Sequence, residues 1–192
     1  MLSYFRPAIT LLVVFIALTG LAFPLALTGV ANVLFPAEAA GSQISRNGKV
    51  VGSRLIGQAF ASDRYFHGRP SAAGQSGYDA LSSSGSNLGP LSRQLLERVG
   101  NDVTRLRKAG ATDIPADAVT TSGSGLDPHI SPAYAELQVE RVARTRGVSP
   151  DRVRTLVAQG TEQRALGFIG EPRINVLLLN LALDRTFGAG SG

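Results

Sequence analysis

The chain has 192 residues, of which 44% are hydrophobic and 17% are charged, and its formal net charge is +5. No charged side chain occurs from Pro7 to Ala37, whereas the rest of the chain carries both signs. An uncharged apolar stretch of this length exceeds the roughly 20 residues that cross a bilayer, and the remainder has the size of one ordinary domain. This split argues against a simple cytosolic globule and against a polytopic membrane protein. The lack of cysteine excludes disulfides, a thiol nucleophile and a cysteine-based zinc site.

The apolar stretch predicts a single transmembrane helix over residues 8–35, preceded by a short cytoplasmic N-terminus, residues 1–7. A cleaved signal peptide is the alternative, and Ala37–Ala39 would supply its cleavage site, but the apolar region is about twice the usual length. Arg6 lies close to the start of the span, so the positive-inside rule places the N-terminus in the cytoplasm. Residues 38–192 are then a periplasmic (extracytoplasmic) domain held at the cell (inner) membrane.

Three residues within the span bear on its packing in the lipid. Pro24 removes a backbone donor and predicts a tolerated kink. Gly20 and Gly29 offer the small surface that favours close packing against neighbouring membrane helices.

After the span, Asn47-Gly48 predicts a type I′ turn in a hairpin over Ser42–Ile56, which Leu55–Phe60 could extend. Tyr65-Phe66 is predicted to begin a short strand, and the Gly- and Ser-rich stretch Gly68–Pro90 to form a long ordered loop.

Four helices are predicted from apolar periodicity and from capping residues. They run from Pro90 to a stop at Gly110, from Pro132 to Arg146, from Pro150 to a stop at Gly160, and from Val176 to Phe187 with Asn175 as cap.

Further short strands are expected at Ala118–Thr121 and Phe168-Ile169. Because the helices and strands do not alternate regularly as βαβ units, the predicted fold class is α+β.

The basic residues, all but two of them arginine, do not predict a nucleic-acid interface. The densest runs, Arg105–Lys108 and Arg141–Arg146, are interpreted as solvated helix faces or helix C-termini. No aromatic residues interleave with them to form a stacking platform.

Catalytic signatures are missing: there is no phosphate loop and no Gly-x-Ser-x-Gly elbow. A hydrolase that uses Ser122 or Ser124 with His129 and Asp127 is a weak hypothesis, because residues two apart seldom pair in a triad that also reaches the serine. Asp127 and His129 alone offer too few ligands for a metal site. We therefore expect no catalytic residues and no metal.

Two segments have residue types that ordinary loops seldom combine, so we consider each as a candidate functional site. In Tyr65–Ser71, Arg69 is either an anchor for a partner or a buried structural arginine, with neither favoured. Ser122–Pro132 could receive an anion or a partner's carboxylate at a helix start, although a turn with a cap is favoured. The candidate subunit-contact or structural residues are Tyr65, Phe66, His67, Gly68, Arg69, Pro70, Ser71, Ser86, Asn87, Ser122, Gly123, Ser124, Gly125, Asp127, His129 and Asn175.

With these motifs in order, the sequence resembles the C subunit of the bacterial Kdp potassium-transporting ATPase over essentially its whole length. One departure is visible, since the family's usual Ser-Gly-Gly-Ser-Asn is Ser-Ser-Gly-Ser-Asn at residues 83–87. The matching blocks are Arg6-Pro7, Leu55–Gln58, Tyr65–Ser71, Gly85–Leu88, Ser122–Pro132, Arg141–Ala143 and Asn175–Asp184.

The resemblance implies a non-catalytic accessory subunit of an ATP-driven potassium uptake complex. Its partners would be a channel-like potassium-binding subunit, a P-type ATPase subunit and a small single-span subunit, besides membrane lipid. The family is described as a catalytic chaperone that raises the ATP affinity of the ATPase subunit. An outer domain cannot reach cytoplasmic ATP, so we expect the complex, and not this chain, to handle potassium and ATP. The role expected for the domain is to assemble the complex and to cap the potassium entrance. An anchored hydrolase or a ligand-binding sensor is the alternative.

Overall fold

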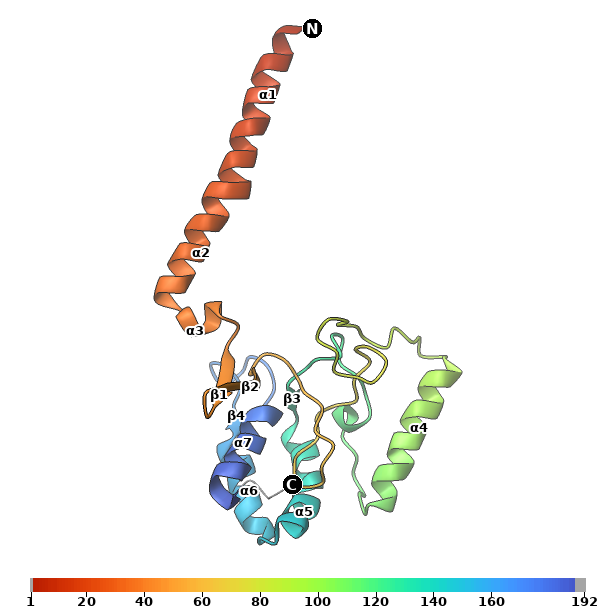
Figure 1. Cartoon of the computed structure of the whole chain (residues 1–192). Helices are drawn as coiled ribbons and strands as arrows, with labels where there is room; N and C mark the ends of the chain where they lie inside the picture. Colours follow the sequence, from red (N-terminus) through yellow and green to blue (C-terminus); the bar gives the residue numbers. More distant parts are fainter. Residues whose placement is uncertain (1, 189–192) are drawn as a thin grey trace. The chain divides into compact units, whose positions relative to one another are not determined.

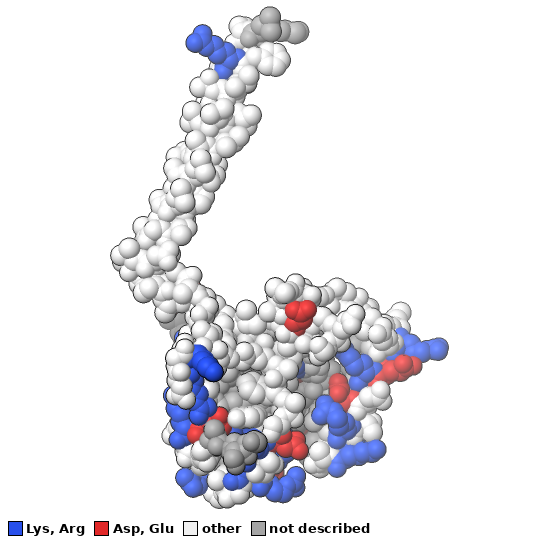
Figure 2. All heavy atoms as spheres, in the orientation of Figure 1, with Lys and Arg blue, Asp and Glu red and all other residues white. Residues whose placement is uncertain are grey.

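The computed structural model describes residues 2–188 and divides into two compact units, residues 1–51 and residues 52–192. In the first unit, helix α1 (Leu2–Ile16), the π-helical segment η1 (Ala17–Ala22) and helix α2 (Phe23–Leu34) follow one another as one continuous helix (Figure 1). Its stretch Ser3–Leu34 is long and apolar enough to cross a membrane, with a mean hydropathy of 2.4. Figure 2 shows an uncharged surface along this helix, apart from the end where the sequence places Arg6. The helix begins before residue 8, earlier than predicted.

The π-helical segment lies directly before Pro24. A proline has no N–H to donate, so the regular hydrogen bond from this position is missing. The N–H of Phe23 donates to the carbonyl of Leu18, five residues back, which is the wider spacing of a π-helix. A Cβ added at Gly20 or at Gly29 would meet no atom within 4 Å, so both glycines present open surface. Their packing against other membrane helices stays a prediction.

Helix α3 (Pro36–Ala39) leads into the hairpin of strands β1 (Gln43–Arg46) and β2 (Lys49–Ser53). Asn47 and Gly48 have φ values of +52° and +75°, which confirms the predicted turn. The predicted extension over Leu55–Phe60 is wrong, because the chain turns at this point.

The second unit is an α+β domain, as predicted, with one small sheet. Its strands lie in the order β3-β5-β4 and pair antiparallel, with His129 opposite Asn175 and Thr161 opposite Ile174. The elements are α4 (Arg93–Lys108), the 3₁₀ turn η2 (Ala116–Ala118), β3 (His129–Ile130), α5 (Pro132–Arg146), α6 (Pro150–Gln159), β4 (Thr161–Glu162), β5 (Arg173–Asn175) and α7 (Val176–Phe187).

Capping side chains set the starts of α5 and α7, as the sequence indicated, whereas Ser149 before α6 makes no such hydrogen bond. Ser131 and Asn175 accept hydrogen bonds from the N–H groups of Tyr134 and Leu178, and Gly147 ends α5 in the left-handed conformation. Helix α4 begins at Arg93 rather than at Pro90, because Ser92 is its cap.

The core lies between α5, α6, α7 and the small sheet. Its largest fully buried apolar side chains are Phe66, Ile130, Val139, Val142, Val153, Ile174 and Leu183. Helix α4 is only partly buried, along Val99, Val103 and Leu106, whereas its Leu96 is 63% exposed.

Two predicted strands are wrong. Ala118–Thr121 instead begins at the end of the 3₁₀ turn η2, where the N–H groups of Ala118 and Val119 donate to carbonyls three residues back. Phe168 lies in an exposed turn, and Ile169 forms only an isolated bridge with Ala165. The long loop Gly68–Pro90, in contrast, has the irregular structure that its composition predicted.

Candidate functional site

The segment Tyr65–Ser71 is not a strand, because side chains rather than a neighbouring strand take up its main-chain groups. The side-chain amide of Asn180 accepts from the N–H of Phe66 at 2.8 Å and donates to its carbonyl at 2.9 Å. Gln138 does the same for His67, at 2.7 and 3.1 Å. Buried main-chain groups need partners, and two amides from α7 and α5 provide them here without a sheet.

Two arginines of α5 continue this pattern. Arg141 donates to the carbonyls of Asp63 and Tyr65 at 2.7 and 3.0 Å, and Arg146 donates to the carbonyl of Arg64 at 2.7 Å. The interpretation of Arg141–Arg146 as a solvated helix face is thus wrong for these two residues, although Arg146 does lie in the last turn of α5, the other location that the sequence allowed. Both side chains instead donate to main-chain carbonyls of the loop before Phe66.

Arg146 also forms an ion pair with Asp184 of α7, at 2.9 Å. The two side chains are only 1% and 6% exposed. The guanidinium lies over the Tyr65 ring, 5.0 Å from its centroid, and the Tyr65 hydroxyl donates to Asp184 at 3.1 Å. This cluster fastens the start of the Tyr65–Ser71 segment between α5 and α7.

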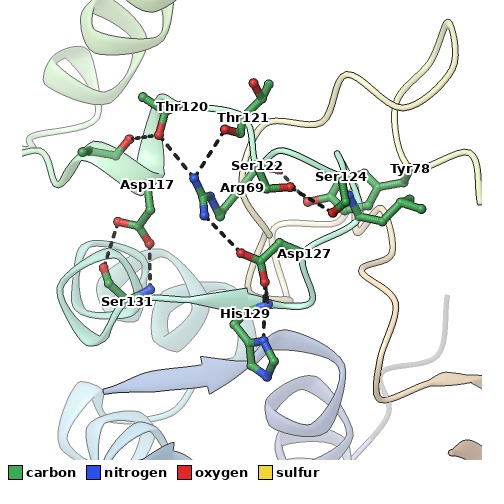
Figure 3. Close-up of polar contacts among 12 residues, drawn as sticks. Arg69, Tyr78, Asp117, Thr120, Thr121, Ser122, Ser124, Asp127, His129 and Ser131 are labelled. Carbon is green, nitrogen blue, oxygen red and sulfur yellow. Dashed lines mark hydrogen bonds and ion pairs between the residues drawn. The ribbon is translucent and has the colours of Figure 1, made fainter. Parts of the chain in front are cut away.

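Arg69 points into the loop that precedes β3 (Figure 3). Its guanidinium forms a 3.0 Å ion pair with Asp127 and donates to the carbonyl of Thr121 at 3.4 Å and to the hydroxyl of Thr120 at 3.5 Å. Its Nε is buried and has no hydrogen-bond partner within residues 2–188. Arg69 therefore ties its own segment to Thr120–Asp127.

Asp127 connects Arg69 to the beginning of β3. One carboxylate oxygen faces Arg69, and the other accepts from the N–H of His129 at 2.9 Å and lies 3.4 Å from its ring Nδ1. Partial burial opposes ionisation, but the hydrogen bonds from His129 and Arg69 prevail and hold the pKa of Asp127 below its usual value. The carboxylate is thus a charged linker between two loops.

The Ser122–Leu126 turn packs against the long loop Gly68–Pro90. Ser71 donates to the carbonyl of Gly125 at 2.6 Å, and the N–H of Ser84 donates to the carbonyl of Ser124 at 2.9 Å. Gly125 has a φ of +66°, and a Cβ added there would lie 2.5 Å from the carbonyl oxygen of Ser84. Only glycine combines this conformation with so close an approach.

Tyr78 joins two parts of the long loop by hydrogen bonds to Ser71 and Arg69. Its backbone has a φ of +58°, its N–H donates to Ser71 at 2.8 Å, and its hydroxyl donates to the carbonyl of Arg69 at 2.6 Å. Burial raises the pKa of the Tyr78 phenol to about 12, so the hydroxyl keeps its proton and remains a donor. These hydrogen bonds agree with the prediction that Gly68–Pro90 forms an ordered loop.

The start of α5 is the place where the sequence allowed an anion or a partner's carboxylate. In the structure Asp117 of the same chain lies there and accepts from the N–H and the hydroxyl of Ser131 at 2.7 and 2.9 Å (Figure 3). The helix start thus already has a carboxylate.

The other candidate residues, Ser86, Asn87 and Asn175, lie apart from the contacts of Arg69 and Asp127. Ser86 is half-buried and Asn87 is exposed with a φ of +51°. Asn175 caps α7 and donates to the carbonyl of Arg54 at 2.8 Å.

The hydrolase alternative has no support in this geometry. The His129 ring points away from Ser122 and Ser124, and Asp127 is shared with Arg69 (Figure 3). Among residues 2–188, no group of three or more His, Asp or Glu side chains is placed to hold a metal ion. On the face shown in Figure 2, acidic and basic side chains intermingle rather than forming a patch of one sign.

The sequence did not predict that Gln138, Asn180 and Asp184 hold the loops in place. It also did not predict that Arg146 points inward. A signal was present, because Asn180 lies in the middle of an otherwise leucine-rich helix. A polar amide at such a position needs a buried partner.

The chain thus combines an apolar helix that is long enough to anchor it in a membrane with an α+β domain whose polar side chains fasten its own loops. The family model described as "KdpC: K+-transporting ATPase, c chain" matches residues 5–185, so the chain belongs to that family.

Curated relatives agree with this assignment over at least 95% of their length. The chain is 54% identical over 200 residues to the potassium-transporting ATPase KdpC subunit of Methylobacterium nodulans, covering 98% of this chain and 100% of the relative. It is 57% identical over 189 residues to the subunit of the same name from Caulobacter vibrioides, with 97% and 95% covered. The subunit of Rhodopseudomonas palustris is 54% identical over 198 residues, with 97% and 98% covered.

Proposed function

We propose that the chain acts as a non-catalytic, membrane-anchored subunit that assembles and stabilises a potassium-transporting ATPase. Membership of the c-chain family, over residues 5–185, carries the assignment to this complex. The partners would be a channel-like potassium-binding subunit, a P-type ATPase subunit and a small single-span subunit. The chain would contribute a rigid surface to them and no reaction of its own.

The topology that we propose is a single span with the N-terminus in the cytoplasm and residues 38–192 outside it. Two features support it: the apolar helix Ser3–Leu34 and Arg6 near its cytoplasmic end. The outer domain would cap the entrance through which potassium reaches the channel-like subunit. An effect on ATP affinity would then be transmitted through the complex, because the domain and cytoplasmic ATP lie on opposite sides of the membrane.

The absence of catalysis is supported by the use of the polar groups in the Arg69–Asp127–His129 cluster. Asp127 uses both carboxylate oxygens within the chain, and Arg69 contacts Asp127 and the Thr120-Thr121 turn. Such an arrangement holds loops in place for a partner, whereas a catalytic site needs a nucleophile or base facing a substrate.

The experiment that tests this proposal is copurification from membranes. A tagged full chain should bring down the channel-like and ATPase subunits, and a variant without residues 1–37 should lose them. His129→Ala should keep both the subunits and potassium uptake. If the truncated chain still assembles and supports transport, anchoring is not the function of residues 1–37. If His129→Ala abolishes an activity of the subunit alone, that result supports the hydrolase hypothesis instead.

A further inference from the structure

A short apolar turn projects from the domain between β4 and β5. We name residues 164–171 the apolar finger. Its tip carries Leu166, Phe168 and Ile169, which are 84%, 72% and 52% exposed. Side chains of this kind are costly to leave in water in a cluster, and such clusters mark interaction sites.

The apolar finger is ordered by its own main chain. The N–H of Ala165 donates to the carbonyl of Ile169, and the N–H of Ile169 donates back to Ala165, both at 2.9 Å. The N–H of Gly167 donates to the carbonyl of Arg164 at 3.1 Å. The tip is therefore presented by a closed turn and not by a loose loop.

Charged side chains surround the base of the apolar finger. Arg164 pairs with Glu171 at 2.6 Å, while Glu162 accepts from Arg173 at 3.0 Å and lies 3.8 Å from Arg54. Three arginines and two glutamates leave one excess positive charge. Apolar side chains next to arginines match the layering of a bilayer surface, where anionic head groups border the hydrocarbon.

The connection to the membrane span enters the domain beside this base. The chain that follows the span reaches the domain at Arg54, whose guanidinium faces Glu162 and whose carbonyl accepts from Asn175 of β5. The short stretch of residues 35–53 keeps this point within reach of the bilayer in which the helix Ser3–Leu34 is held. Residues 35–53 therefore limit how far the base of the apolar finger can lie from a bilayer that holds this helix.

We propose that the apolar finger inserts Leu166, Phe168 and Ile169 into the outer surface of the lipid bilayer. This inference rests on the proposed anchoring of the chain and adds a second, reversible contact with the same membrane. The contact would help to fix the orientation of the domain above the membrane plane.

The test uses the absence of cysteine from the chain. Leu166→Cys and Phe168→Cys are made in the full chain, labelled with a nitroxide and reconstituted in vesicles of phosphatidylethanolamine and phosphatidylglycerol. Collision rates with oxygen, which concentrates in lipid, and with a water-soluble nickel chelate give the depth of each label. Leu81→Cys is the matched control, since Leu81 is 97% exposed on another loop. A label at Val14→Cys reports whether the span itself lies in lipid.

The proposal expects a higher oxygen-to-nickel ratio at positions 166 and 168 than at position 81. Equal ratios at all three, with position 14 deep in lipid, overturn the apolar finger's insertion and leave the anchor intact. Shielding at 166 and 168 that arises only when the partner subunits are added also overturns it, in favour of a protein contact. A label at position 14 that is open to the nickel chelate overturns the anchor and the insertion together.

Discussion

Asn180 holds the main chain of Phe66 by two hydrogen bonds, accepting from its N–H at 2.8 Å and donating to its carbonyl at 2.9 Å. One side-chain amide on α7 thereby forms the two main-chain hydrogen bonds that a neighbouring strand would form, with a residue 114 positions earlier. Phe66 is fully buried in the core of the domain. The Tyr65–Ser71 segment is consequently fixed to the helices from which it is farthest in sequence.

Replacing this amide should destabilise the domain severely. Asn180→Leu keeps most of the volume but leaves the N–H and carbonyl of Phe66 buried without partners, and we expect a loss of about 2–4 kcal/mol in the free energy of unfolding. Urea unfolding of the full chain in detergent measures it. Asn101→Leu, at an exposed position on α4, is the matched control and should change little. Equal effects of the two substitutions would show that the amide is not essential.

The buried ion pair between Arg146 and Asp184 should be similarly sensitive. Arg146→Met leaves the Asp184 carboxylate buried without its cation, which costs about 3–5 kcal/mol when one partner of a buried pair is removed. The same unfolding measurement applies. Arg154→Met serves as control, because Arg154 also pairs with carboxylates but lies at the surface, where ion pairs contribute little. A larger loss for Arg154→Met would contradict this account of the buried pair.

The helices of the domain could be predicted from the sequence, because their signals are local. Ser131-Pro132, Gly147 and Asn175 act within one turn of the helix that they start or end. The strands β3, β4 and β5 could not, since each has only two or three residues and depends on partners far along the chain.

Long-range polar contacts account for the errors at the candidate site. Tyr65-Phe66 has the composition of a strand but pairs with Asn180 and not with another strand. Arg146 looks like a solvent-facing residue near a helix C-terminus, yet the carbonyl of Arg64 and the carboxylate of Asp184 draw it inward. The residue types of Tyr65–Ser71 singled out this segment, whereas its contacts could be found only from the fold.

The packing of the two glycine-containing loops makes a third prediction. Gly125→Ala places a Cβ against the Ser84 carbonyl and should destabilise the domain by about 1–3 kcal/mol. Gly147→Ala is a matched control, because Gly147 has nearly the same φ, +67°, with no atom within 4 Å of the added Cβ. Both variants share the backbone strain, so the difference in their free energies of unfolding measures the contact between loops. No difference would contradict the close approach.

The stability of the domain should fall with acidification partly through His67. Burial, followed by the nearby Arg141 charge, lowers the pKa of His67 below 6.5 in the folded protein. The unfolded chain therefore takes up the proton first, so the contribution is complete above about pH 6.5 and is lost as the pH falls through the folded pKa.

His67→Gln has no proton to gain in this range. We expect the drop in the free energy of unfolding between about pH 7.5 and about pH 5 to be smaller in the variant than in the wild type. All other titrating groups are common to both proteins and cancel in the comparison. Parallel pH profiles would exclude a contribution from His67.

The most direct test of the proposed function is the side of the membrane on which the domain lies. A tag after Gly192 is exposed to protease added to spheroplasts, with a cytoplasmic protein as the control for intact cells. The account predicts that the C-terminal tag is removed while a tag before Met1 is protected. Protection of the C-terminal tag would place the domain in the cytoplasm, contradict the potassium-entrance cap and make direct contact with ATP the better explanation.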